Sequence, residues 1–263
     1  MIKIGVAGCS GRMGKSVVHA VLADEDVRLS GATVRKGSNN VGQDIGDVCL
    51  TKPTGILISD NNDDVFDQAD IVIDFTLPEA TIDHLKTAVR HKVPMVIGTT
   101  GLGKNQREDI FQASKEIPIV FSSNMSVGVT ALTAVVEQVA ALLDESFDIE
   151  VFEMHHRHKL DAPSGTAITL GQAAANGRGV SLAESAQRCR NGKRQTGEIG
   201  FASSRGGNVA GDHSVIFAGD HEVVTLNHRA FNREVFASGG VKAAKWLKSK
   251  APGLYTMRDV LGI

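Results

Sequence analysis

The feature that most constrains this chain is an apolar run followed at once by a glycine-rich loop and a helical pattern. Ile2–Ala7 predicts a buried strand, Gly8–Gly14 a tight turn, and Arg12–Ala23 a helix. Similar short apolar runs recur through the first half of the chain and alternate with helical patterns such as Glu79–His91, which follows Pro78. Because buried strands separated by helices must join through crossovers, the pattern predicts an α/β fold with a Rossmann-type doubly wound parallel sheet. The further runs are Arg28–Val34, Asp70–Phe75, Pro94–Gly98 and Ile117–Phe121.

The second half of the chain has a different pattern. Apolar residues keep helical spacing from Val129 to Leu143, and later runs alternate apolar and polar residues as half-buried strands do. We expect a dinucleotide-binding domain at residues 1–126 and 234–263, and an α+β domain with a mixed sheet at residues 127–233. The second domain would bind substrate and join subunits, and residues 176–197 are expected to form a long mobile loop. Its strands are expected at Phe147–Met154, Ile199–Ser204, Asn208–Ala218 and His221–His228.

Composition excludes several classes of protein. A formal net charge of −2 offers no basic field for nucleic acid, and no apolar stretch is long enough to span a membrane. The three cysteines are far apart and have no spacing typical of a disulfide framework or a metal site. We therefore expect a cytoplasmic protein that binds neither nucleic acid, membrane nor metal.

The glycine loop predicts a dinucleotide site. Glycines let the backbone approach a pyrophosphate closely, and the start of the next helix offers free N–H groups and the positive end of its dipole. A structural turn is the alternative, because such motifs are weak when they stand alone. The expected cofactor-binding residues are Gly8, Cys9, Ser10, Gly11, Arg12 and Met13.

The end of the second strand indicates which cofactor is used. An acidic residue there would bind the ribose of NAD, but the chain has Thr33-Val34-Arg35-Lys36. Arg35 and Lys36 suit a 2′-phosphate, so NADPH is expected to be preferred and NADH possible. Two solvated cations are the alternative. Two further loops at strand ends are candidates for holding the nicotinamide ribose and carboxamide, with ordinary turns as the alternative: Gly98, Thr99 and Thr100, and Ser122, Ser123, Asn124 and Met125.

A histidine- and lysine-rich segment carries the chemistry. His155 and Lys159 are possible proton donors, and the helix start at Ser164-Gly165-Thr166 suits a carboxylate. Together they predict a site for a small anionic substrate that is protonated during reaction. A metal site, a solvated basic loop and a nucleophilic Ser164 are the alternatives; an N-cap explains that serine more simply.

These motifs give the chain a strong resemblance to the 4-hydroxy-tetrahydrodipicolinate reductase family, also called dihydrodipicolinate reductases. The resemblance extends from Ile4 to the C-terminal helix. It rests on Gly8–Gly14, Gly98–Gly101, Ser123–Gly128, His155–Lys159, Asp161–Ala167, Gly207–His213 and Ala243–Leu247.

The resemblance implies an NAD(P)H-dependent oxidoreductase of lysine and diaminopimelate biosynthesis, assembled as a homotetramer through the sheet of its second domain. It makes His155 the general acid and Lys159 its partner. The family usually has an acidic residue where Val34 stands, and this departure favours NADPH. Another NADP-dependent reductase of a small dicarboxylate, or a non-catalytic dinucleotide sensor, remains the alternative. The residues implied to hold substrate carboxylates are His156, Lys159, Ser164, Gly165 and Thr166.

Overall fold

The computed structural model describes all 263 residues, which form two compact units. Unit 1 comprises Met1–Val127 and Arg233–Gly262, and unit 2 comprises Gly128–Asn232 together with Ile263. Both junctions lie one residue away from the boundaries that the sequence suggests, with Val127 and Arg233 in unit 1.

Unit 1 is built on a six-stranded sheet in the order β11-β5-β4-β3-β1-β2, in which every pairing is parallel. The order reverses at β1, which has β2 on one side and β3 on the other. In such sheets, ligands bind at the carboxyl ends of the strands near this reversal. The strands are β1 (Ile2–Ala7), β2 (Val27–Ala32), β3 (Ile71–Asp74), β4 (Met95–Ile97), β5 (Pro118–Phe121) and β11 (Gly253–Tyr255).

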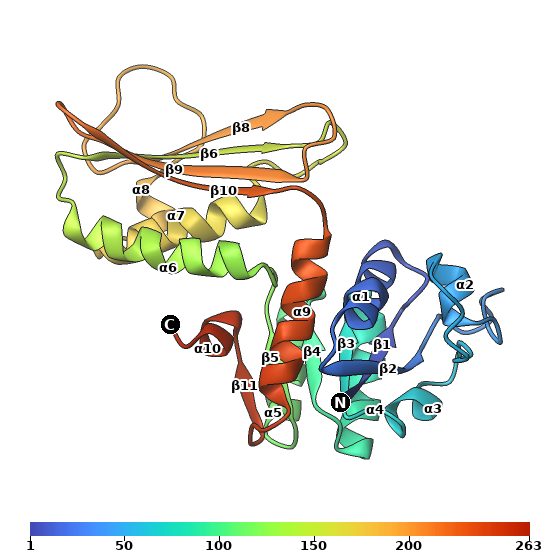
Figure 1. Ribbon diagram of the computed structural model, residues 1–263. Coiled ribbons are helices and arrows are strands. Elements are labelled where there is room, and N and C mark those ends of the chain that lie inside the picture. The colour runs from blue at the N-terminus through green and yellow to red at the C-terminus, as the bar shows by residue number, and fades with distance from the viewer. The chain divides into compact units, whose positions relative to one another are not determined.

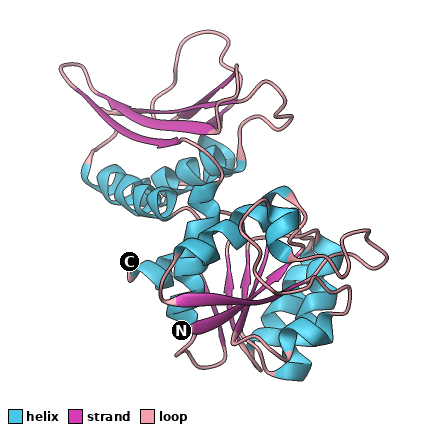
Figure 2. Cartoon of the chain, turned by 45° about the vertical axis from the view of Figure 1, so that its right-hand side comes forward, coloured by secondary structure: helices cyan, strands magenta, loops and turns pink.

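Helices cover both faces of this sheet (Figures 1 and 2). One face packs against α1 and α9 through residues such as Val17 and Val241, and the other against α4 and α5 through Leu85 and Ile110. Pro78 opens α4 at its first helical position, where its missing N–H costs nothing. The doubly wound parallel sheet expected from the sequence is confirmed. The helices are α1 (Arg12–Ala23), α2 (Ile45–Cys49), α3 (Asn62–Phe66), α4 (Pro78–His91), α5 (Lys104–Ser114), α9 (Glu234–Leu247) and α10 (Met257–Leu261).

Unit 2 has a mixed five-stranded sheet in the order β10-β9-β6-β8-β7, as the alternating patterns predict. Strand β9 runs antiparallel to β10 and β6, whereas β6, β8 and β7 are parallel. Helices α6 and α7 cover one face, and Figure 1 shows no helix on the other. The elements are α6 (Val127–Leu142), β6 (Asp148–His155), α7 (Gly165–Arg178), α8 (Leu182–Ser185), β7 (Ala186–Gln187), β8 (Ile199–Arg205), β9 (Gly211–Ala218) and β10 (Val223–Ala230).

Residues 176–197 do not form one long loop, which corrects the expectation from the sequence. Helix α7 continues to Arg178 and ends at Gly179, whose φ of 66° is left-handed. Helix α8 and strand β7 follow. The cause is packing that composition does not reveal: Leu182 is buried in the core of unit 2, and Arg178 donates to the carbonyls of Ala140 and Phe147.

No helix of the structure combines the length and the apolar character needed to cross a bilayer.

Candidate active site

The loop after β1 has the form that a dinucleotide pyrophosphate needs. Gly8 has a left-handed φ of 67°, and a Cβ at Gly14 would lie 2.1 Å from the Gly8 carbonyl oxygen. Gly11 is the N-cap of α1 and has no side chain to cap the first turn of that helix. Cys9 is fully buried, and burial raises the pKa of its thiol to about 12, so this residue offers a ligand its backbone only. The residues present therefore fit the phosphates of a dinucleotide.

The segment after β2 has a buried residue followed by two exposed cations. Val34 is buried in the core of unit 1, while Arg35 and Lys36 are exposed in the turn that follows. Arg35 and Lys36 are therefore the side chains of this segment that can reach a ligand. Asp60 lies beside this turn and accepts from the Gly37 N–H at 3.0 Å.

The loops after β4 and β5 offer fewer side chains than the sequence suggested. Thr99 is buried, and its Oγ1 lies 2.8 Å from Thr81 Oγ1 and 3.4 Å from Asp74 Oδ1. Thr100 is exposed, and Met125 is buried in the core. Ser122 donates to the carbonyl of Asn124 at 2.7 Å, and Ser123 is exposed. Thr100 and Ser123 are thus the exposed side chains of these loops, and binding of a nicotinamide group there stays a prediction.

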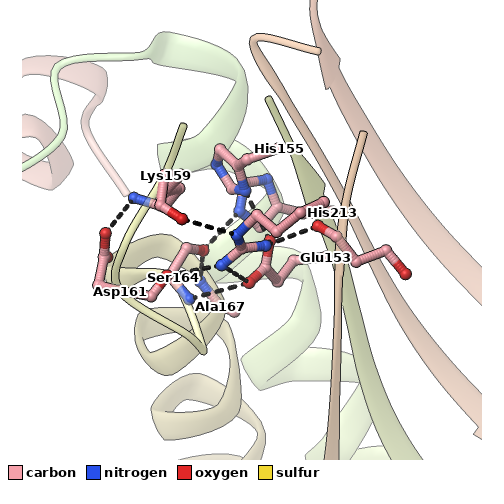
Figure 3. Close-up of polar contacts among 9 residues, drawn as sticks. Glu153, His155, Lys159, Asp161, Ser164, Ala167 and His213 are labelled. Carbon is pink, nitrogen blue, oxygen red and sulfur yellow. Dashed lines mark hydrogen bonds and ion pairs between the residues drawn. The ribbon is translucent and has the colours of Figure 1, made fainter. Parts of the chain in front are cut away.

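In unit 2, the histidine of interest stands at the end of β6 beside a buried carboxylate. Glu153 and His155 are two residues apart on one strand, so both face the helices, and both are buried. His155 Nδ1 lies 2.6 Å from Glu153 Oε2 (Figure 3). This contact directs Nδ1 toward the carboxylate and leaves Nε2 as the atom that can reach a ligand.

Arg205 holds the same carboxylate from the end of β8. Its Nη1 and Nη2 lie 2.8 and 2.9 Å from the two oxygens of Glu153. Burial opposes the charge of Glu153, but hydrogen bonds from Arg205, His155 and Ser203 outweigh it and lower the pKa of the carboxyl to about 2. Glu153 is therefore ionised throughout the physiological range.

The start of α7 lies against this carboxylate. The Ser164 N–H donates to Glu153 Oε1 at 3.2 Å, and Ser164 Oγ caps the helix by accepting from the Ala167 N–H at 3.1 Å. Gly165 is exposed and Thr166 half-buried on the first turn. The helix start thus lies next to His155, and its role in binding a substrate carboxylate stays a prediction.

Lys159 has a partner that the sequence analysis did not assign. Its Nζ lies 2.8 Å from Asp161 Oδ1, and this contact lowers the pKa of Asp161. Lys159 is partly exposed, so its ammonium group can exchange Asp161 for a ligand carboxylate. His156 is half-buried, and its ring centroid lies 6.2 Å from that of His158.

A second histidine, His213 on β9, stands edge-on to His155 with ring centroids 5.1 Å apart. Its Nε2 lies 3.0 Å from Ser164 Oγ. Burial, followed by the proximity of His155, lowers the pKa of His213 to about 4. His213 is therefore neutral at physiological pH, and His155 is the ring that contacts the Glu153 carboxylate. No group of three or more His, Cys, Asp or Glu side chains is placed to hold a metal ion.

Sequence reasoning missed Glu153, Arg205 and His213. One signal was available, because Glu153 precedes His155 by two residues on a predicted strand and must share its face. The other two depend on strand register: Glu153 pairs with His213 across β6 and β9, and His155 pairs with Arg205 across β6 and β8. Such register does not follow from the local pattern.

Comparison with known proteins covers the whole chain. The family model described as "Dihydrodipicolinate reductase, N-terminus" matches residues 2–125, and "Dihydrodipicolinate reductase, C-terminus" matches residues 128–261. The chain is 49% identical over its whole length to 4-hydroxy-tetrahydrodipicolinate reductase from Afipia carboxidovorans, covering 97% of that protein. It is 47% identical to that of Parvibaculum lavamentivorans, again over the whole chain and 98% of the relative.

Solved structures agree on the fold. The chain aligns with a dipicolinate-bound dihydrodipicolinate reductase from Paenisporosarcina sp. TG-14 at a TM-score of 0.75 and 24% identity, over 97% of both chains. An amine dehydrogenase from Mycobacterium smegmatis aligns at 0.66 and 14% identity, over 97% of this chain and 95% of the other. The resemblance inferred from the motifs is confirmed by the family models and the relatives, and the chain belongs to the dihydrodipicolinate reductase family.

Proposed function

We propose that this chain reduces 4-hydroxy-tetrahydrodipicolinate to tetrahydrodipicolinate with a hydride from NADPH, in the diaminopimelate route to lysine. The observation that carries the proposal is the His155–Glu153 pair, buried beside a helix start that suits a carboxylate, in a chain of this reductase family. The nicotinamide supplies the hydride, and the residues of unit 2 supply the proton and hold the dicarboxylate.

His155 is the general acid of the proposal. Hydride addition to the substrate ring, with loss of its 4-hydroxyl as water, builds negative charge on the imine–enamine system. Nε2 of His155 delivers a proton to that system while Nδ1 stays on Glu153. Lys159 assists from the loop that follows. Positioned proton transfer of this kind contributes about 10² to 10⁴ in rate.

The substrate's carboxylates are assigned to the first turn of α7 and the cations beside it. Gly165 and Thr166 offer N–H donors and the Thr166 hydroxyl, Ser164 fixes the start of the helix through its bonds to Glu153 and Ala167, and Lys159 adds positive charge beside the His156 ring. The structurally similar Paenisporosarcina reductase is described as bound to dipicolinate, a planar dicarboxylate. Donors fixed in this way orient the ring for reaction, which is worth more than affinity alone.

NADPH is the expected cofactor, held on unit 1 by the loop from Gly8 to Met13 and by Arg35 and Lys36. The two exposed cations favour a 2′-phosphate over a hydroxyl. The Asp60 carboxylate beside Gly37 weakens this preference without reversing the local charge. NADH remains a usable second cofactor, and a cytoplasmic location remains a prediction.

A homotetramer is the proposed assembly, joined through the sheet of unit 2. The face of this sheet away from α6 and α7 carries Phe152, Ile216 and Val223, of which Val223 is 60% exposed. Apolar side chains on an uncovered sheet face suit contact with a second copy. Light scattering after size exclusion would measure the assembly, and a monomer at micromolar concentration would contradict it.

The test of function follows NADPH, and separately NADH, by absorbance while a purified synthase makes the substrate from pyruvate and aspartate semialdehyde. We expect oxidation that requires both precursors and is faster with NADPH. Equal rates with NADH would keep the reaction and remove the cofactor preference. Binding of NADPH without any oxidation would point to a dinucleotide sensor, and oxidation only with another dicarboxylate to a different reductase.

A further inference from the structure

Glu153 connects three parts of the site in unit 2: His155, the start of α7 and Arg205. Its carboxylate is fully buried and contacts His155 Nδ1, both terminal nitrogens of Arg205 and the Ser164 N–H. The Glu153 side chain therefore contacts the proposed general acid His155, the start of α7 at Ser164, and the cation of Arg205. A movement of Glu153 would displace both the proton and the substrate site.

Arg205 extends this connection to the loop that carries Lys159. Its Nε donates to the Lys159 carbonyl at 3.3 Å, and its Nη2 donates to the Asp161 carbonyl at 2.6 Å. A planar guanidinium makes these bonds and the bidentate carboxylate contact at once, which the ammonium of a lysine cannot do. Arg205 thus fixes the backbone on both sides of Leu160, which is itself 97% exposed and lacks packing to hold the loop.

We propose that Glu153 and Arg205 are a positioning pair that orients His155 and holds the Lys159 loop, and that Arg205 offsets the carboxylate so that His155 can release its proton. The proposal rests on the proposed function and adds two residues to it. Neither residue is assigned to the substrate or the cofactor.

The orientation follows from the ring nitrogens. With Nδ1 on Glu153, the other nitrogen of His155 points toward Gly211, where a Cβ would lie 3.0 Å from Nε2. A glycine at this position leaves space around the atom that must meet the substrate. A ring turned over would bury that atom against the carboxylate instead.

The charge argument has two opposing parts. A carboxylate at hydrogen-bond distance from an imidazole attracts positive charge on the ring, while a cation on the same carboxylate reduces that attraction. The other titratable groups of the cluster are His213, edge-on to His155, and the Lys159–Asp161 pair. Glu153 and Arg205 are thus expected to move the proton affinity of the site in opposite directions.

The test is the pH profile of kcat/KM for Glu153→Gln and Arg205→Met. Removing the carboxylate should move the alkaline limb of the profile to lower pH by about one unit, and removing the cation should move it to higher pH by a similar amount. The Glu153→Gln/Arg205→Met double variant should restore the limb nearly to its original place while kcat stays at least about tenfold low. Arg229→Met removes an exposed ion pair with Asp212 on the same sheet and should leave the profile unchanged.

The proposal would be overturned if the alkaline limb moved in the same direction in Glu153→Gln and Arg205→Met, or if it moved in neither variant. If Arg205→Met does not fold, the double variant and Arg205→Lys still decide it. The lysine keeps the positive charge but cannot make the bidentate contact of the guanidinium. Arg205→Lys should therefore leave the alkaline limb of the pH profile in place and raise KM for substrate. An inactive wild-type enzyme would instead count against the proposed function, and titration of the His155 ring by NMR would then test the pair without turnover.

Discussion

Each unit of this protein contains one buried carboxylate–histidine pair, and the two pairs are almost equally enclosed. Asp74 and Glu153 are fully buried, and the side chains of His84 and His155 are 9% and 10% exposed. The Nδ1-to-oxygen distances are 2.8 and 2.6 Å. Burial and geometry alone do not separate a proton donor from a structural histidine.

The neighbours of the two pairs do separate them. Asp74 is surrounded by neutral donors: the N–H and hydroxyl of Thr76 and the hydroxyl of Thr99. Glu153 is held by Arg205 and by the N–H at a helix start, and Arg205 also contacts the backbone of the Lys159 loop. The first pair ties the ends of β3 and β4 to helix α4, while the second is surrounded by groups that attract an anion. The comparison teaches that charge around the pair, more than the pair itself, marks a site.

The strongest test of this difference exchanges each histidine for asparagine, whose amide can keep the Nδ1 bond while the Nε2 atom is lost. His155→Asn should lower kcat by about 10² to 10⁴, because the proton donor is gone. His84→Asn should change kcat less than about threefold. NADPH binding, measured by fluorescence, should be unaltered in His155→Asn. Similar losses of kcat in both variants would make the two pairs equivalent and remove His155 as the acid.

A second test asks whether the Asp74–His84 pair is structural. Hydrogen bonds from His84 and Thr76 overcome burial and hold the pKa of Asp74 below its usual value. Asp74→Asn replaces an acceptor oxygen with an N–H that faces other donors, so the free energy of unfolding should fall by about 3 kcal/mol. Urea denaturation followed by circular dichroism measures this. Asp83→Asn, on the exposed face of the same helix, should cost less than about 0.5 kcal/mol.

Local sequence patterns predict much of unit 1. Helix α1 lies at Arg12–Ala23 as expected, because the glycine turn and the apolar spacing both define its start. Helix α4 follows from Pro78. The short helices α2 and α3 and the polar helix α5 have weak patterns, and the sequence analysis did not assign them. Their positions depend on packing against the sheet, which a local window does not contain.

The site in unit 2 was predictable only in part. His155, Lys159 and Ser164 lie within a single segment, so their proximity follows from the motif. Arg205 is 52 residues from Glu153, and its contact depends on the parallel pairing of β6 with β8. A change of register by one residue would place every side chain of β8 on the other face, so no composition rule could assign this cation.

The neutral state of His213 gives a further difference between the units: the free energy of unfolding of unit 2 should depend on acid pH. The pKa of His213 is about 4 in the folded protein and about 6.5 in an unfolded chain. As pH falls below 6.5, the unfolded state binds a proton that the folded state does not accept until about pH 4. Stability is therefore lost across this window, on the order of 2–3 kcal/mol. His213→Gln should flatten the dependence of unfolding free energy on pH between 6.5 and 4, and an unchanged slope would contradict a neutral His213.

The donors assigned to the substrate carboxylates, Lys159 and Thr166, predict a smaller effect, on substrate binding. Lys159→Met and Thr166→Val each remove a donor to a substrate carboxylate, so KM should rise about tenfold or more. Dipicolinate, as a non-reacting dicarboxylate, should lose affinity in parallel. Lys86→Met, an exposed cation of unit 1, serves as the control. An unchanged KM in either variant would remove that residue from the carboxylate site.

Substitution of Arg35 is expected to have the smallest effect on kinetics, because Arg35 is exposed, whereas Arg205 is half-buried. An exposed charge acts through water and salt, so Arg35→Ser should raise KM for NADPH only about three- to tenfold and leave KM for NADH unchanged. The difference should shrink as ionic strength rises, which steady-state kinetics at low and high salt would measure. Arg205 differs here: it holds the fully buried Glu153 carboxylate, so the effects of Arg205→Met should depend much less on salt. Equal salt dependence at both arginines would mean that enclosure does not distinguish them, and a loss of NADH binding in Arg35→Ser would show that this residue does not read the 2′-phosphate.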